Sequence, residues 1–258
     1  MAIYSLKKSY QLKDLQEVDF KDLWGDHGIF TTMWIFGKPA KILFFENHIK
    51  NLIKSLKRYG IKKKSLHKII LDTVNKNLSR NVNYNHLLRV AINRKIISIS
   101  FRKRLNPKSN FNLKLVNLKR EKPQYKNLKY KKILKHLIKL DNSKSDIGLV
   151  SNKRILETGT SNLLFIKRNK VYTPIKGYYE GNTLKFFKSK IKKIIKKNIF
   201  VKDVKNYDEI LLVGSGKGVA SVKTINQIGW KRRNLKQFKI LSNHYNLIKN
   251  KCKPYKFY

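Results

Sequence analysis

The stretch "LETGTSNLLFIKRNKVYTP", residues 156–174, carries a single carboxylate, Glu157, in a chain with few acids. Small polar residues follow it, and two apolar runs at 163–166 and 170–174 flank the turn "KRN". This pattern predicts a strand that ends at Glu157 and a β-hairpin after it. Taken alone, the acid has a structural interpretation, as a turn cap or a partner for a lysine. It also has a functional one, as the partner of a cationic group on a bound cofactor.

The chain around that acid is strongly basic. Its 258 residues include 60 Lys plus Arg and 15 Asp plus Glu, which gives a net charge of +45. Dense positive charge attracts nucleic acids and anionic membranes. However, 49 of these cations are lysines spread along the chain, and Asn, Ile, Tyr and Phe are also frequent, which is typical of AT-rich coding sequences. We therefore favour a compositional origin and expect no nucleic-acid partner.

Length and composition indicate a folded protein with one large domain or two of ordinary size. The chain is 41% hydrophobic and 11% aromatic, which is too much for a disordered protein. Cys252 is the single cysteine, so no internal disulfide and no cysteine metal site is expected, and the six histidines show no metal spacing. The sequence has no apolar signal core and no apolar run of membrane-span length. We expect a cytoplasmic protein without a membrane partner.

Residues 1–118 have the pattern of an α/β domain. Strands are predicted from β-branched and aromatic runs, and helices from apolar residues at helical spacing. The predicted strands are 29–36, 40–45, 86–92 and 96–101, and the predicted helices are 47–61 and 65–79. The polar segment 119–125, which contains Pro123, is the predicted connection between domains.

Residues 126–258 form the predicted second domain. Apolar spacing predicts helices, and short β-rich runs separated by turns predict two hairpins and a buried strand. The predicted helices are 128–140 and 184–197, the hairpins are 147–157 and 163–174, and the strand is 209–215. The whole chain is therefore expected to be an α+β protein of two domains.

Three further segments carry candidate chemistry. In "EGNTLKFF", Asn182 and Thr183 follow Gly181 at the first turn of a predicted helix, where free N–H groups form either a phosphate site or an ordinary N-cap. In "VGSGKG", residues 213–218, a strand runs into Gly-Ser-Gly, which is either a second phosphate contact or only a turn. In "QYKNLKY", other lysines surround Lys126, and close cations favour the neutral amine that a nucleophilic lysine requires.

The order of these segments resembles that of one known family. "YKNLKY", "LETGTSNLLFI", "VYTP", "EGNT" and "LLVGSG" follow one another as in the fold-type IV pyridoxal-phosphate enzymes. This family includes branched-chain and D-amino-acid aminotransferases and aminodeoxychorismate lyase. In the first half, "WGDHGIFTT" is similar to the family's Gly-Asp-Gly-x-Phe strand, and "ENHIKNLIKSL" to its His-x-x-Arg-Leu helix. The resemblance runs from about residue 24 to 225.

The resemblance implies an enzyme with pyridoxal 5′-phosphate as its cofactor and a small amino compound as its substrate. Lys126 would bind the cofactor covalently and move the substrate Cα proton, and Glu157 would pair with the ring nitrogen. Tyr179 stands where the family packs an apolar side chain on the ring, and a phenol can stack there. The phosphate would be held by Asn182, Thr183 and Ser215.

The resemblance also implies an oligomer and an architecture. The family forms homodimers. Each chain has a small N-terminal α/β domain and a larger C-terminal β-barrel-like domain with flanking helices. We therefore expect a homodimer of two-domain subunits with the fold of fold-type IV enzymes.

The sequence departs from the family pattern at three positions. The family's phosphate-binding arginine is Asn51, the arginine after the Gly-Ile-Thr motif is Leu184, and the asparagine three residues after the lysine is Lys129. Losing a bidentate arginine–phosphate contact weakens cofactor binding. Lysines can substitute as point charges, and the candidates are Lys50, Lys54 and Lys185.

Within the family, the short chain and "GIFTT" favour the lyase, which releases pyruvate from aminodeoxychorismate and gives 4-aminobenzoate. The alternative is an aminotransferase that acts on branched-chain or D-amino acids. A third alternative, from another class, is a basic binding protein on an enzyme scaffold that has lost catalysis. Candidate substrate contacts are Thr31 and the arginines Arg89, Arg94 and Arg102.

Overall fold

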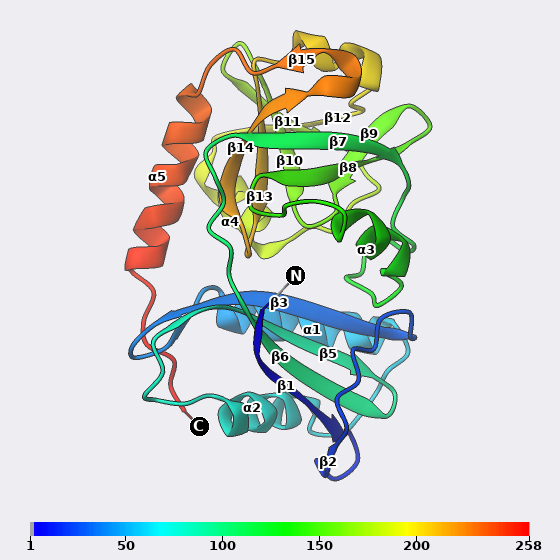
Figure 1. Ribbon diagram of the computed structural model, residues 1–258, viewed down its shortest axis with the longest axis vertical. Helices are drawn as coiled ribbons and strands as arrows, with labels where there is room; N and C mark the ends of the chain where they lie inside the picture. Colours follow the sequence, from blue (N-terminus) through cyan, green and yellow to red (C-terminus); the bar gives the residue numbers. More distant parts are fainter. Residues whose placement is uncertain (1–2, 258) are drawn as a thin grey trace. The chain divides into compact units, whose positions relative to one another are not determined.

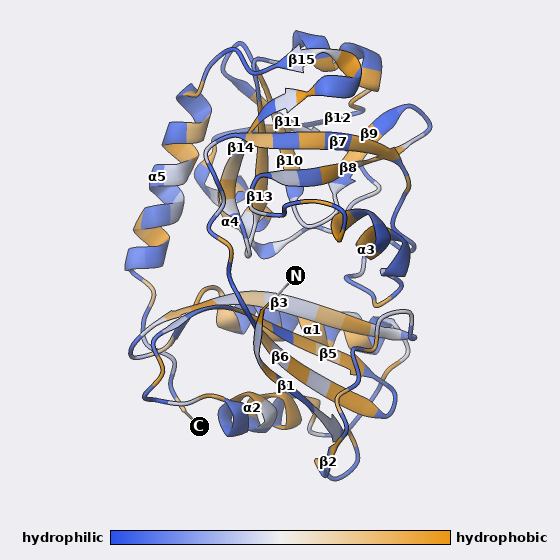
Figure 2. Cartoon of the chain, in the orientation of Figure 1, coloured by the Kyte–Doolittle hydropathy of each residue, from blue (hydrophilic) through white to orange (hydrophobic). Residues whose placement is uncertain are grey.

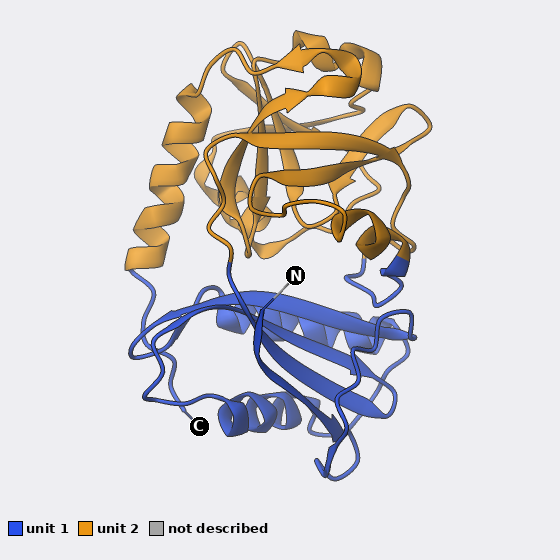
Figure 3. Cartoon of the chain, in the orientation of Figure 1, with its two compact units in different colours: residues 1–104, 125–131, 251–258 blue, residues 105–124, 132–250 orange. Residues whose placement is uncertain are grey.

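The computed structural model describes residues 3–257, which form two compact units (Figure 3). Unit 1 contains the described residues up to Arg104, the segment Tyr125–Lys131, and the described residues from Lys251 on. Unit 2 contains Leu105–Gln124 and Lys132–Asn250. Each unit combines a sheet with helices packed on it, which confirms the predicted α+β class.

Unit 1 is built on an antiparallel sheet with the strand order β2-β1-β6-β5-β3-β4 (Figure 1). The helices α1 (Phe45–Arg58) and α2 (Leu66–Asn77) pack on one face, where Ile29, Met33 and Ile35 of β3 share a buried core with them. The predicted strands 29–36, 86–92 and 96–101 and both predicted helices are confirmed. The strands are β1 (Tyr4–Gln11), β2 (Glu17–Val18), β3 (Gly28–Gly37), β4 (Lys41–Ile42), β5 (Tyr84–Asn93) and β6 (Ile96–Lys103).

The predicted strand at 40–45 is wrong beyond its first residues. Only Lys41 and Ile42 pair, opposite Phe36 and Ile35 of β3. Phe44 then takes a left-handed conformation with φ 58°, and α1 begins directly after it. The apolar run is buried in the core, so its hydrophobicity did not distinguish a strand from a turn into a helix.

Unit 2 is built on a mixed sheet that curls into a half-barrel (Figure 1). The strand order is β12-β11-β10-β13-β14-β7-β8-β9, and β15 pairs with β14. Apolar residues of the strands, such as Phe111, Phe165 and Leu212, fill its core. Figure 2 shows hydrophobic stretches along these strands. The strands are β7 (Phe111–Asn117), β8 (Ser145–Ser151), β9 (Arg154–Thr158), β10 (Asn162–Lys167), β11 (Lys170–Pro174), β12 (Ile194–Lys197), β13 (Glu209–Gly214), β14 (Gly218–Ile225) and β15 (Trp230–Lys231).

Two helices in the second half are shorter than predicted. The helix α3 is Lys131–Leu137 rather than 128–140, because Leu128 packs in a small core of unit 1. The helix α4 (Asn182–Lys190) ends early, and the rest of the predicted helix 184–197 includes the strand β12, which pairs in parallel with β11. Its β-branched isoleucines have helical spacing but also favour a strand, and pairing with β11 decides the outcome.

The last helix, α5 (Lys236–Asn250), packs on β14 through the buried residues Leu241 and Tyr245. The N–H groups of its second and third residues, Gln237 and Phe238, donate to the buried Glu209 carboxylate at 2.8 and 3.0 Å. A carboxylate at this end of a helix satisfies its free donors and complements its dipole. None of the helices in residues 3–257 has the length and apolarity that crossing a membrane requires.

The two units divide the chain differently from the predicted boundaries, 1–118, 119–125 and 126–258. The strand β7 pairs with β14 and β8, so it belongs to unit 2. The segment Tyr125–Lys131 belongs to unit 1, because its main chain pairs with the start of β3. Lys126 is therefore a residue of unit 1, whereas Glu157 is a residue of unit 2.

Candidate active site

The segment that carries Lys126 is fixed by its main chain to the first residues of β3. Phe30 N donates to the Lys126 carbonyl, and Leu128 N donates to the Gly28 carbonyl, both at 2.9 Å. A Cβ added at Gly28 would collide with the Ile92 carbonyl oxygen and lie 2.5 Å from Leu128 Cδ1. Glycine alone leaves room for this approach, so the segments "GIFTT" and "YKNLKY" fit each other as one structural piece.

The Lys126 side chain is half-buried on the sheet face opposite α1. Its Nζ lies 5.2 Å from the centre of the Phe30 ring, and Phe30 belongs to the small core on that face. An aromatic face attracts an ammonium group and orients it. The neighbouring Lys129 is exposed, and its Nζ donates to the Gly25 carbonyl at 2.7 Å. The two lysines are therefore held in different surroundings.

Thr31, a predicted substrate contact, points into the helix-covered face of this sheet. Its neighbours along β3 on that face, Ile29 and Met33, are core residues. The Thr31 hydroxyl lies 2.7 Å from Nδ1 of His48 on α1, and both residues are buried. This pair joins α1 to the sheet, which gives Thr31 and His48 a structural role within unit 1.

Arg89 lies on the other face, because it stands opposite Thr32 and not opposite Thr31. Its Nη2 donates to Asp22 Oδ1 at 2.6 Å, and its guanidinium lies 4.4 Å from the Trp24 ring. Burial lowers the pKa of Arg89, while the Asp22 carboxylate acts in the opposite direction. Arg94 is exposed in the turn between β5 and β6. The predicted contacts Thr31, Arg89 and Arg94 are thus not brought together.

In unit 2, Glu157 is buried beside Arg120. Arg120 Nε donates to Glu157 Oε1 at 2.8 Å, and Tyr179 N lies 3.4 Å from Oε2. The two side chains are only 5% and 4% exposed. A buried carboxylate needs a countercharge, and Arg120 supplies it.

The start of α4 has the features of an anion site. Gly181 is its N-cap, and no side chain caps the helix. Asn182 and Thr183, its first residues, are buried. The Thr183 hydroxyl has no hydrogen-bond partner among residues 3–257. A buried hydroxyl without a partner is costly, and a ligand oxygen would satisfy it together with the N–H groups of the first turn.

Asn162 holds the segment that leads into α4. Its Nδ2 donates to the Tyr179 carbonyl at 2.6 Å, and its Oδ1 accepts from Gly181 N at 3.0 Å. Burial raises the pKa of the Tyr179 phenol to about 12. Tyr179 is therefore a neutral phenol at ordinary pH, held between Glu157 and the helix start.

Ser215 lies in the turn between β13 and β14 and is half-buried. A Cβ added at the preceding Gly214 would lie 3.0 Å from Ser161 Oγ. The turn therefore packs against the "TGTS" segment that follows Glu157. Within unit 2, the structure thus connects the segments of Glu157, Asn182, Thr183 and Ser215.

The departures from the family pattern have different structural outcomes. Leu184 is completely buried in α4, so this position is part of the core. Asn51 is half-buried on α1, one turn after His48. At position 184 a buried apolar side chain therefore stands in place of the family's arginine. At position 51 a neutral amide stands in its place.

Sequence reasoning missed two basic residues of unit 2. Arg120 stood in the predicted polar connection, and Lys217 was considered only as part of a turn. Lys217 in fact pairs with the buried Asp146 at 3.0 Å. Among 60 basic residues neither one stands out. The scarcity of acids was the signal that could have pointed to them, because each buried acid requires a basic partner.

Pyridoxal phosphate fits the donor set that these residues offer. Its phosphate needs N–H and O–H donors, which the start of α4 supplies together with the Thr183 hydroxyl. Its protonated ring nitrogen needs an anion, and Glu157 is a buried carboxylate. Its aldehyde needs an amine, and Lys126 is a half-buried lysine on an aromatic face. Unit 2 therefore offers partners of the kind that the phosphate and the ring nitrogen require, and unit 1 offers an amine of the kind that the aldehyde requires.

Solved structures with the same fold are diverse in activity. A branched-chain aminotransferase from Thermoproteus uzoniensis, with norvaline, has a TM-score of 0.76 at 14% identity, and the match covers 97% of this chain and 96% of that one. A putative 4-amino-4-deoxychorismate lyase from Legionella pneumophila has a TM-score of 0.68 at 19% identity, with 86% and 91% covered. A branched-chain amino acid aminotransferase from Thermobaculum terrenum, in its PLP-form, has a TM-score of 0.73 at 12% identity, with 94% of each chain covered.

The sequence itself carries the family assignment. No curated protein matches the chain. The family model "Amino-transferase class IV" matches residues 28–225, which is most of the chain. The chain therefore belongs to the class IV aminotransferase family, and it is an enzyme of the pyridoxal-phosphate-dependent aminotransferase and lyase class.

Proposed function

We propose that this enzyme is a lyase that releases pyruvate from 4-amino-4-deoxychorismate and gives 4-aminobenzoate, a folate precursor. The main support for a phosphate-bearing cofactor is the buried hydroxyl of Thr183 at the start of α4, where no side chain caps the helix. This hydroxyl lacks a hydrogen-bond partner in residues 3–257. A phosphate oxygen would satisfy this hydroxyl. The buried Glu157 supports a ligand that carries a cationic ring as well as a phosphate.

Lys126 is the proposed residue for covalent attachment and proton transfer. When bound, pyridoxal phosphate draws electrons from the bonds at the substrate carbon next to nitrogen. Lys126 Nζ, oriented on the Phe30 ring, takes the proton from that carbon. The bond between the adjacent ring carbon and the enolpyruvyl oxygen would then break, and the released enolpyruvate would take up a proton and become pyruvate, which leaves the aromatic ring of 4-aminobenzoate. Glu157 would pair with the protonated ring nitrogen, and Arg120, which donates to Glu157 Oε1 at 2.8 Å, would fix the orientation of that carboxylate.

The remaining site residues bind and orient. Asn182 and Thr183 would hold the phosphate at the start of α4, and Ser215 would add a contact from its turn. Tyr179 would pack on the cofactor ring as a neutral phenol, since its pKa of about 12 is far above working pH. Because Asn51 brings no positive charge, we expect weaker phosphate binding than in relatives with arginine there.

Cofactor binding is tested by titrating the purified protein with pyridoxal phosphate. We expect a visible absorbance band that saturates and that the Lys126→Ala variant lacks. A matched control is Lys129→Ala, which removes an exposed lysine three residues away. No band in the wild-type protein at saturating cofactor would overturn the enzyme proposal. Salt-sensitive retention on nucleic acid by that same protein would then favour the binding-protein alternative.

The lyase assignment rests on "GIFTT" and on the length of the chain. The second candidate is an aminotransferase that acts on branched-chain or D-amino acids, and amino transfer is the activity for which the family is named. The two are separated by assaying 4-aminobenzoate and pyruvate release against amino transfer to 2-oxoglutarate. Equal molar release of both products supports the lyase. Amino transfer without 4-aminobenzoate would support the aminotransferase instead.

A homodimer is the proposed assembly, as the family resemblance implies. Two subunits that each carry +45 repel one another, and salt screens this repulsion. We therefore expect the dimer fraction, measured by light scattering, to rise with salt concentration. A dimer fraction that falls with salt would mean that attractive ion pairs dominate the interface.

A further inference from the structure

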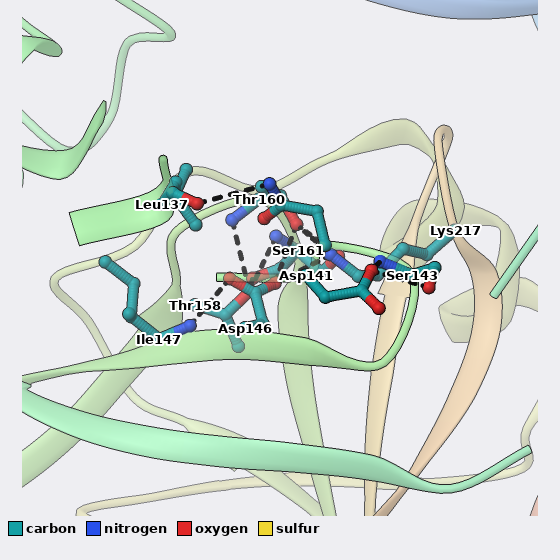
Figure 4. A network of polar contacts seen from close by, with 10 residues as sticks. Leu137, Asp141, Ser143, Asp146, Ile147, Thr158, Thr160, Ser161 and Lys217 are labelled. Atoms are coloured by element: carbon teal, nitrogen blue, oxygen red, sulfur yellow. Dashed lines mark hydrogen bonds and ion pairs between the residues drawn. The ribbon is translucent and has the colours of Figure 1, made fainter. Parts of the chain in front are cut away.

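A second buried charge cluster lies beside the turn that carries Ser215 (Figure 4). Its centre is Asp146 in β8, which is completely buried. Asp146 Oδ2 accepts from the hydroxyls of Thr158 and Thr160 at 2.8 and 2.7 Å and from Lys217 Nζ at 3.0 Å. Lys217 Nζ also donates to Thr160 Oγ1 at 2.6 Å. Asp146, Thr160 and Lys217 thus close a triangle of hydrogen bonds.

The turn needs such a tether because glycine surrounds Ser215. In "VGSGKG", Gly214, Gly216 and Gly218 alternate with Ser215 and Lys217. Glycine loses more conformational freedom on ordering than any other residue, so this turn is not rigid by itself. Lys217 is the side chain in the turn that reaches a buried, fixed partner, and its side chain is only 10% exposed. The ion pair therefore removes the freedom that the glycines introduce.

The other side of the same cluster leads to the start of α4. Thr158 Oγ1 accepts from Ser161 N at 2.8 Å, which fixes the "TGTS" segment. The next residue, Asn162, holds the Tyr179 carbonyl and Gly181 N. Asn162 also pairs with Val213 at the end of β13, two residues before Ser215. The "TGTS" segment thus connects the turn of Ser215 with the segment that begins α4.

We propose that Asp146 and Lys217 are positioning residues for the cofactor phosphate. They act through Ser215 and the "TGTS" segment and do not touch the cofactor. This inference rests on the proposed function, because it assigns the phosphate to the turn of Ser215 and the start of α4. It explains how a chain with Asn51 and Leu184 at the family's arginine positions presents an ordered phosphate site. Donors that are already fixed in place lose less conformational freedom when the phosphate binds. This gain offsets the missing attraction of the two arginines.

The test compares two ligands that differ only in the phosphate, pyridoxal phosphate and pyridoxal. Dissociation constants are measured from the visible band for the wild-type protein, Lys217→Met and Thr160→Val. The matched control is Lys223→Met, which removes an exposed lysine from β14, the strand that follows the turn of Lys217. We expect Lys217→Met to weaken pyridoxal phosphate binding by about tenfold or more, the usual scale for losing a group that orients a ligand-binding residue. We expect its pyridoxal affinity to change less than about twofold, within the scatter of context effects.

Thr160→Val keeps the ion pair and removes the connecting hydroxyl, so it covers the case in which Lys217→Met does not fold. It should lower pyridoxal phosphate affinity in the same selective way, and Thr160→Ser should restore it. An equal loss for both ligands would overturn the proposal and leave the cluster a structural brace. Unchanged affinities in both variants would also overturn it, while wild-type binding would leave the proposed function intact. A wild-type protein that binds neither ligand would overturn both.

Discussion

The two units hold their candidate cofactor residues by different means. In unit 1, main-chain hydrogen bonds to β3 fix the segment of Lys126, and Gly28 leaves the room for it. In unit 2, buried side-chain ion pairs hold the segments around Glu157 and Ser215. Of the acids in residues 3–257, those classed as buried are Asp146, Glu157 and Glu209, all in unit 2. The segment of Lys126 therefore depends on the space that Gly28 leaves. The segments around Glu157 and Ser215 depend on buried ion pairs.

Removing one partner of the buried pair should have the largest effect. Arg120→Met leaves the Glu157 carboxylate buried without its countercharge. We expect the free energy of unfolding to fall by about 3 to 5 kcal/mol, measured by denaturant unfolding of the protein without cofactor. The double variant Arg120→Met with Glu157→Gln should recover part of this loss, because neither charge remains. A single variant within about 0.5 kcal/mol of wild type, the range of ordinary surface substitutions, would contradict the account.

Filling the space at Gly28 should displace the segment of Lys126 in unit 1. Gly28→Ala places a methyl group against Leu128 Cδ1 and the Ile92 carbonyl. We expect a loss of about 1 to 3 kcal/mol in the free energy of unfolding, as for other overpacked positions. The segment 126–128 must also shift, so covalent attachment of the cofactor should be lost.

Gly60→Ala is the control for that variant. Gly60 has φ +82° with open space around its position, so alanine is strained there without a clash. This strain costs about 1 to 2 kcal/mol, a loss similar to that of Gly28→Ala, yet cofactor attachment should persist. If both variants lose the attachment equally, general instability and not the fit of the Lys126 segment is responsible.

The ion pair of Arg89 and Asp22 in unit 1 can be compared directly with the buried pair of Arg120 and Glu157 in unit 2. Arg89 is buried, but the Asp22 side chain is 51% exposed, so water already screens the pair. We expect Asp22→Asn to lower the free energy of unfolding by less than about 1 kcal/mol. A loss as large as that of Arg120→Met would mean that buried charge is not what distinguishes unit 2.

Alkaline pH tests the burial of two phenols in unit 2, those of Tyr179 and Tyr207. Burial raises the pKa of Tyr179 and of Tyr207 to about 12, whereas tyrosines of the unfolded chain ionise near pH 10. Below pH 10 both states keep these protons, so the two phenols add no pH dependence. Between pH 10 and 12 the unfolded state releases protons that the folded state retains, so stability falls as pH rises. Replacing both tyrosines with phenylalanine should flatten this part of the stability curve, and an unchanged slope would contradict the burial argument.

The sequence predicted the elements whose pattern is local. The strand at 29–36 has a β-branched and aromatic run, the helices of unit 1 have apolar residues at helical spacing, and both predictions were confirmed. The helix predicted at 184–197 was wrong after Lys190, because pairing with β11 outweighs helical spacing. Arg120 was not predicted as the partner of Glu157, since nothing local in 37 residues of separation connects them. Tertiary pairing, of strands and of charges, is what the sequence pattern did not contain.

The central claim is that Lys126 is the residue that binds pyridoxal phosphate. The direct measurement is reduction of the protein–cofactor complex with borohydride, followed by peptide mapping in a mass spectrometer. The account predicts one phosphopyridoxyl group per chain, on Lys126, and none on Lys129. Labelling spread over exposed lysines in proportion to their accessibility, with Lys126 no more modified than Lys129, would contradict it.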